Sequence, residues 1–232
     1  MRPEESPFLA CWWGSSLEKA GLADVRARAS TYGRYDFHLL PSVPFEPRGD
    51  FSWLLAEPER DFHIGSEKPD ENVGALKSLK QSAQADGWAL PMSLLTFMSS
   101  PELHARIRSN TDCFLDLCPA VIPAPVQGGG LIRFLADSQG CLFWYLYLTR
   151  AGDHAVVASD SFFGTKEEEW DDEGARSQDV AFVAESLEVF IWRFWLENEI
   201  WRAAHYDKVP VEQSGKAYIA EYRRKADALG AA

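Results

Sequence analysis

The sequence lacks several features that define large classes of proteins. No stretch approaches the roughly 18 to 20 continuous apolar residues that a membrane-spanning helix needs. The first residues, MRPEESPFLACWW, carry two glutamates and a proline where a secretory signal has a basic flank and a longer apolar run. Four cysteines at irregular spacing in 232 residues favour reduced, buried thiols over a disulfide framework. These absences predict a cytoplasmic protein.

Signatures of metal binding and catalysis are also absent from the sequence. Cys113 and Cys118 have four residues between them and no second Cys/His pair nearby, so ordinary packing explains them better than zinc. The five histidines show no HExxH or HxH spacing, and the glycine run 128–130 precedes no Lys-Ser/Thr that would make a phosphate loop. We interpret His154 as a turn histidine and Cys141 as a buried thiol, and we expect no cofactor, no metal and no catalysis. An enzyme of unrecognised type that uses these two residues stays as an alternative.

Aromatic residues, in contrast, are abundant. The chain is 46% hydrophobic and contains nine Trp and fourteen Phe, which is enough apolar surface to offset the entropy lost on folding. Its length suits one domain over 1–232. We divide it into an N-terminal extension with helices (1–84), a core (85–206) and a C-terminal helical tail (207–232).

The net charge of −12 is distributed unevenly along the chain. Residues 151–200 contain thirteen acids and three bases, a net −10, so the remaining residues carry only −2. An acidic segment repels nucleic acid and anionic lipid, and it speeds the encounter with basic partners. We therefore expect a basic protein partner, and neither nucleic acid nor a membrane.

Six of these acids lie within seven residues, in the stretch KEEEWDDEG. Their mutual repulsion lowers stability unless solvent or a cation relieves it. Trp170 adds the large amphipathic surface that is enriched at binding interfaces. The alternatives are a solvated loop and an indole that turns inward to anchor that loop. The predicted partner-binding residues are Glu167, Glu168, Glu169, Trp170, Asp171, Asp172 and Glu173.

Helix signals occur in several segments of the chain. Ser15 and Glu18 have capping-box spacing and Gly33 can end a helix, which predicts a helix over 15–33. Further helices are predicted over 70–87, after Leu90-Pro91, from Ser100-Pro101 and in the tail from 214. The segment 186–206 has apolar residues on two sides, so it is either sandwiched within the fold or offers one side to a partner such as a second copy. The apolar residues of the two sides are Leu187, Phe190, Ile191, Phe194 and Trp201 on one, and Trp192, Leu196 and Ile200 on the other.

From Cys113 to Ala184 the pattern favours antiparallel strands. Short apolar runs at 113–118, 131–149, 154–159 and 179–184 are separated by Pro, Gly, Asp and Ser, and the turn Asp137-Ser138-Gln139-Gly140 joins two of them. The strand 141–149 is apolar on both faces, so we expect it to be central in the sheet and covered on each side.

The order of these elements is similar to that of one known family. Gly87-Trp88, Leu90-Pro91 with a short apolar helix, the hairpin FLADSQGCLFWYLYL, HAVVAS and AESLEVFIWRFW together resemble the SUKH superfamily, the Smi1/Knr4-like proteins, over about residues 85–204. The resemblance implies an α+β fold with a mostly antiparallel sheet of about five or six strands packed by helices. It also implies a binding role, because many bacterial members neutralise toxins as immunity proteins. A regulatory or scaffolding module of the same fold is the alternative.

Overall fold

The computed structural model describes residues 1–27, 30–165 and 179–230. Internal contacts divide the chain into two compact units. The first unit comprises residues 1–9 and 47–190, and the second comprises 10–46 and 191–232. In the described part of the chain, no helix combines the length and the apolar character that crossing a bilayer requires.

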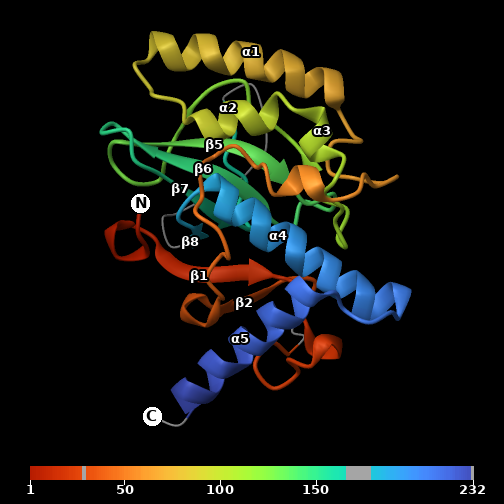
Figure 1. Ribbon diagram of the computed structural model, residues 1–232. Helices are drawn as coiled ribbons and strands as arrows, with labels where there is room; N and C mark the ends of the chain where they lie inside the picture. The colour runs from red at the N-terminus through yellow and green to blue at the C-terminus, as the bar shows by residue number, and fades with distance from the viewer. Residues whose placement is uncertain (28–29, 166–178, 231–232) are drawn as a thin grey trace. The chain divides into compact units, whose positions relative to one another are not determined.

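The first unit contains an antiparallel sheet in which β6 is central. Strand β5 pairs with β3, β4 and β6, and β7 pairs with β6 and β8, in antiparallel register throughout (Figure 1). The strands are β3 (Phe114–Leu115), β4 (Ile122–Pro123), β5 (Gly129–Ala136), β6 (Phe143–Thr149), β7 (His154–Ser159) and β8 (Val180–Ala184).

Both faces of β6 are covered, as its sequence predicts. On one face the Trp144 ring lies 6.2 Å from that of Phe190, at the start of α4 (Leu187–Trp201). On the other face Tyr145 packs edge-on against Phe163 at 5.7 Å. Because side chains alternate along a strand, the even and odd residues of β6 meet different layers. The chain that covers the odd face leads directly into the acidic stretch.

The predicted turn between β5 and β6 is confirmed. Asp137 Oδ1 accepts hydrogen bonds from the backbone N–H groups of Gln139 at 3.0 Å and Cys141 at 3.2 Å. Gly140 has φ of 70°, a left-handed conformation that glycine adopts readily. Cys141 lies at the end of this turn and is exposed, so the prediction of a buried thiol is wrong. The turn places it outside the apolar strand that follows.

Three helices of the first unit match the sequence signals: α1 (Pro69–Ala85), α2 (Met92–Met98) and α3 (Pro101–His104), the last a single turn. Helix α1 is fixed to the edge of the sheet by Asn72, which is buried. Its amide donates to the carbonyl of Leu115 and accepts from the N–H of Leu117, both at 2.9 Å. One side chain thus replaces backbone pairing along that edge of β3.

The second unit contains the antiparallel pair β1 (Leu9–Gly14, with Leu9 in the first unit) and β2 (Gly33–Asp36), most of α4, the π-helical stretch η6 (Arg202–Asp207) and α5 (Gln213–Gly230). The helix predicted over 15–33 is wrong. That segment contains only the short 3-10 turn η2 (Glu18–Ala20), and Gly33 begins a strand. Gly21, with φ of 96°, ends the turn, and Arg26 is held in a buried ion pair that a continuous helix does not supply.

The second apolar strip of helix α4 is buried. Trp192, Leu196 and Ile200, the second apolar strip, are 7%, 1% and 1% exposed. Trp192 contacts Tyr218 of α5 at 5.8 Å between ring centroids. Asn198 is buried and donates to the carbonyl of Phe194 at 2.8 Å, so it is satisfied within the helix. The strip is covered by the chain's own side chains.

The fold class is α+β with a mostly antiparallel sheet, as predicted. The described residues contain eight strands, however, where we expected about five or six. Two of the eight, β1 and β2, come from the N-terminal residues on either side of the helix predicted over 15–33, where no strand was expected. The pairing of β1 with β2 depends on residues about twenty positions apart in the chain, which no helix-capping signal reveals.

Candidate functional site

The acidic stretch is the predicted binding site. Glu167, Glu168, Glu169, Trp170, Asp171, Asp172 and Glu173 all lie outside the described residues. Whether the Trp170 indole faces a partner therefore stays a prediction. The structure does describe the chain on both sides, up to Thr165 and from Asp179.

Both flanks of the acidic stretch belong to neighbouring strands. Ser159 at the end of β7 pairs with Val180 at the start of β8. The Ser159 hydroxyl also donates to the carbonyl of Asp179 at 2.8 Å. The stretch therefore connects two adjacent strands at one end of the sheet, and both of its attachments are at that end.

The incoming flank is fastened to the odd face of β6. The Tyr145 hydroxyl accepts from the Phe163 N–H at 2.9 Å, and the two rings pack edge-on. Arg133 of β5 donates to the Phe163 carbonyl at 3.3 Å, and its guanidinium lies 4.5 Å from the centre of the Phe162 ring. Two aromatic side chains and both polar groups of Phe163 thus anchor the chain just before the acidic stretch.

Arg133 is itself held in place by an acid. It is 3% exposed, and its Nε donates to Asp116 Oδ2 at 2.7 Å. Lys68 lies 3.5 Å from the other carboxylate oxygen of Asp116. Burial raises the pKa of the Tyr145 hydroxyl, so this group stays protonated at neutral pH. Asp116, Arg133 and Tyr145 thus form a network that holds Phe163, just before the acidic stretch.

His154 and Cys141, the residues of the enzyme alternative, are not brought together. They flank the two ends of β6, since Leu148 pairs with His154 while Phe143 pairs with Ser159. Five residues of strand separate these positions by roughly 17 Å. Partial desolvation and the neighbouring Asp137 carboxylate also raise the pKa of the Cys141 thiol, which disfavours the thiolate. These two side chains do not form a nucleophile and base pair.

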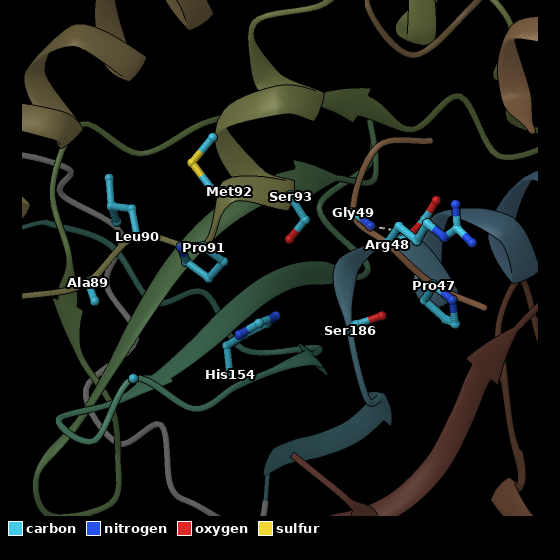
Figure 2. Close-up of a pocket in the computed structure, with 12 residues that line it drawn as sticks. Pro47, Arg48, Gly49, Ala89, Leu90, Pro91, Met92, Ser93, His154 and Ser186 are labelled. Atoms are coloured by element: carbon cyan, nitrogen blue, oxygen red, sulfur yellow. Dashed lines mark hydrogen bonds between the residues drawn. The ribbon is translucent and has the colours of Figure 1, made fainter. Parts of the chain in front are cut away.

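His154 instead lines a pocket of about 460 Å³ in the first unit (Figure 2). Its walls are the segments 47–49 and 89–93, completed by Gly152, His154, Ser186 and Glu188. Burial lowers the pKa of His154, so the imidazole is neutral at pH 7. No local sequence pattern indicates this pocket, because its segments are far apart in the chain.

Glu188 builds one wall of the pocket. It is 2% exposed, and its carboxylate accepts from the N–H groups of Gly49 at 2.6 Å and Phe51 at 3.0 Å. Gly49 has φ of 77°, and a Cβ there would lie 3.1 Å from the Cβ of Ser93. Glycine is therefore required where the 47–51 segment crosses α2. The Glu188 carboxylate thus holds the backbone of the 47–51 segment in place.

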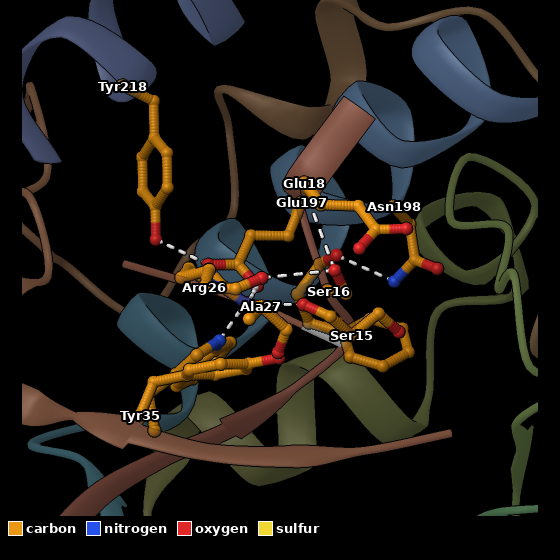
Figure 3. Close-up of polar contacts among 11 residues, drawn as sticks. Ser15, Ser16, Glu18, Arg26, Ala27, Tyr35, Glu197, Asn198 and Tyr218 are labelled. Atoms are coloured by element: carbon orange, nitrogen blue, oxygen red, sulfur yellow. Dashed lines mark hydrogen bonds and ion pairs between the residues drawn. The ribbon is translucent and has the colours of Figure 1, made fainter. Parts of the chain in front are cut away.

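The second unit contains a buried polar network centred on Glu197 (Figure 3). Its carboxylate accepts from Arg26 at 2.5 and 2.9 Å, from Trp12 Nε1 at 2.7 Å and from the Tyr218 hydroxyl at 2.6 Å. Burial acts to lower the pKa of Arg26, but the Glu197 carboxylate outweighs it and raises that pKa above its ordinary value. The two charged groups of this network, Arg26 and Glu197, pair with each other, so its role is structural.

Among the described residues, no group of three or more His, Cys, Asp or Glu side chains is placed to hold a metal ion. Comparison of the chain with protein-family models, with curated proteins and with solved structures finds no match. The candidate sites therefore stand on their own geometry: the anchored base of the acidic stretch and the pocket beside His154.

Proposed function

We propose that this chain is a cytoplasmic, non-catalytic binding protein of SUKH-like fold that captures a basic protein. In the form that the resemblance favours, the partner is a cognate toxin, and the chain is the immunity protein that neutralises it. The observation that carries the proposal is the concentration of charge, with six carboxylates within residues 167–173 and a net −10 over 151–200.

The anchoring of the flanks supports this role. A cluster of like charges lowers stability, yet here it is inserted between two buried strands, β7 and β8. Arg133 and Tyr145 hold the chain that enters it through hydrogen bonds to both backbone groups of Phe163. A fixed attachment reduces the conformational entropy that a binding segment loses when it meets its partner.

The proposed mechanism is occlusion. A toxin that grips phosphate groups or other anionic substrates presents Lys and Arg in its active site, and an acidic surface that docks there excludes the substrate. Long-range attraction gives fast association, and Trp170, once buried at the contact, slows dissociation. No reaction on the partner is required.

The experiment uses two variants with the same net charge. The test variant carries Glu167→Gln, Glu168→Gln and Glu169→Gln. The control carries Asp61→Asn, Glu67→Gln and Glu212→Gln, which remove three exposed acids elsewhere. Each variant raises the net charge by three, from −12 to −9.

Each variant is co-expressed with the basic protein encoded beside this one, and cell survival and pull-down are measured. We expect the wild type and the control to rescue growth and retain the partner, while the test variant loses both. Equal rescue by all three proteins contradicts the acidic docking surface. Capture of a host protein without any effect on toxicity supports the regulatory or scaffolding module instead.

A further inference from the structure

The pocket beside His154 has the size of a small-molecule site and is independent of the acidic stretch. Its volume of about 460 Å³ falls within the roughly 300 to 1,000 Å³ typical of ligand pockets. Leu90, Pro91 and Met92 give it an apolar side (Figure 2). Met92 is 72% exposed, which leaves this large apolar side chain at the pocket without cover.

Ser93 offers the pocket a hydroxyl group that no residue in the described part of the chain uses. Ser93 of α2 is 9% exposed, and no described residue forms a hydrogen bond with its hydroxyl. Figure 2 shows that this hydroxyl points into the space that the His154 ring enters from β7. The residue is nearly buried while its oxygen opens onto the pocket, so a group bound there can hydrogen-bond to this hydroxyl in place of water.

The His154 ring offers complementary chemistry at the same place. Its two nitrogens form no hydrogen bond with any residue in the described part of the chain. A neutral imidazole has one nitrogen that donates and one that accepts. Ser186 also faces the pocket, and its oxygen accepts from the Val189 N–H at 3.3 Å, which leaves its own proton for donation.

Two residues of opposite charge, Glu188 and Arg48, line the pocket. Glu188 accepts two backbone hydrogen bonds from the 47–51 segment, so its carboxylate is already satisfied. Arg48, the cation of the lining, is an exposed residue. The remaining polar side chains of the lining, Ser93, His154 and Ser186, are uncharged, so none of these three supplies a counter-charge to a charged ligand head that loses its hydration there.

We propose that this pocket binds a small uncharged amide that carries an apolar body. An amide accepts through its oxygen and donates through its N–H, which matches the Ser93 hydroxyl and the His154 ring. The apolar body lies against Leu90, Pro91 and Met92. The site is separate from the proposed partner surface and does not depend on the identity of that partner.

The test uses phenylacetamide as the probe and the full chain, with backbone amide chemical shifts followed by NMR. We expect saturable shifts at residues 89–93 and 152–154, with a dissociation constant of about 5 mM, as the ligand efficiency of a small fragment allows. Phenylacetate and 2-phenylethylammonium have the same body with a charged head, and each should bind at least about 5-fold more weakly.

Two serine variants of the same segment complete the test. Ser93→Ala should weaken phenylacetamide binding about 5-fold, because it removes one hydrogen bond and little volume. Ser99→Ala, at the other end of α2, removes a hydroxyl that bonds the Leu95 carbonyl outside the pocket, and it should leave binding unchanged. The absence of shifts in these segments, equal binding of the charged compounds, or an unaffected Ser93→Ala variant would overturn the proposal.

Discussion

Replacement of Glu197 by alanine is the perturbation whose cost the structure defines best. The Glu197 carboxylate is 5% exposed and accepts four hydrogen bonds, two of them from Arg26, which is 0% exposed. Removing it leaves a guanidinium charge buried without its counter-ion. It also leaves the donors of Trp12 and Tyr218 without an acceptor.

The expected cost follows from these losses. Breaking a buried ion pair by removing one partner costs about 3–5 kcal/mol, and the orphaned donors each add up to about 1–3 kcal/mol, although such terms do not sum fully. We expect Glu197→Ala to lower the free energy of unfolding by about 4 kcal/mol, a large share of the roughly 5–15 kcal/mol typical of a domain. Glu197→Gln keeps the volume and one acceptor, so its loss should be smaller.

The assay is denaturant unfolding followed by tryptophan fluorescence, since Trp12 and Trp192 are buried in the second unit. The control is the double variant Arg26→Met with Glu197→Leu, which removes both charges and should recover part of the loss. A cost below about 1 kcal/mol for Glu197→Ala, or a double variant less stable than that single variant, would refute the buried network as a main support of this unit.

Two further predictions concern the first unit. Burial lowers the pKa of His104 to about 4, and its Nε2 bonds the Phe97 carbonyl at 2.7 Å. Because the unfolded imidazole titrates near 6.5, the contribution of neutral His104 to the free energy of unfolding is complete above about pH 6.5 and is lost as the pH falls toward about 4, a change of order 3 kcal/mol. The free energy of unfolding of His104→Gln, measured as a function of pH, should lack that decline. A pH profile equal to that of the wild type would contradict this role of His104. Tyr145→Phe removes the acceptor of the Phe163 N–H and should cost about 1 kcal/mol, while amide exchange at Phe163 speeds up; unaltered exchange there would show that the hydroxyl does not hold this flank.

Much of the first unit is predictable because its signals are local. Asp137 and Gly140 specify the turn between β5 and β6, and the apolar character of both faces of 143–149 specifies a covered central strand. Helix α1 follows its predicted boundaries closely. In each of these cases the neighbouring residues decide the conformation.

The failures involve partners that are distant in sequence. The capping-box spacing of Ser15 and Glu18 predicts a helix, but the ion pair of Arg26 with Glu197 overrides this local preference. Glu197 is 171 residues further along the chain than Arg26. The pocket was also not predictable from local sequence, because Ser93 and His154 belong to a helix and a strand that only the folded chain brings together. Cys141 is exposed because its backbone N–H donates to Asp137 Oδ1 and so keeps it within the turn. The apolar pattern of the strand that follows does not indicate this hydrogen bond.

The most direct test of the central claim is the salt dependence of association with the basic partner. Stopped-flow association rates are measured from low to physiological ionic strength for the wild type, the Glu167–Glu169 triple variant and the Asp61/Glu67/Glu212 control. The account predicts that the triple variant associates about 10-fold more slowly at low salt with a flatter salt dependence, while the control follows the wild type. Equal rates and equal salt slopes for the triple variant and the wild type would contradict it.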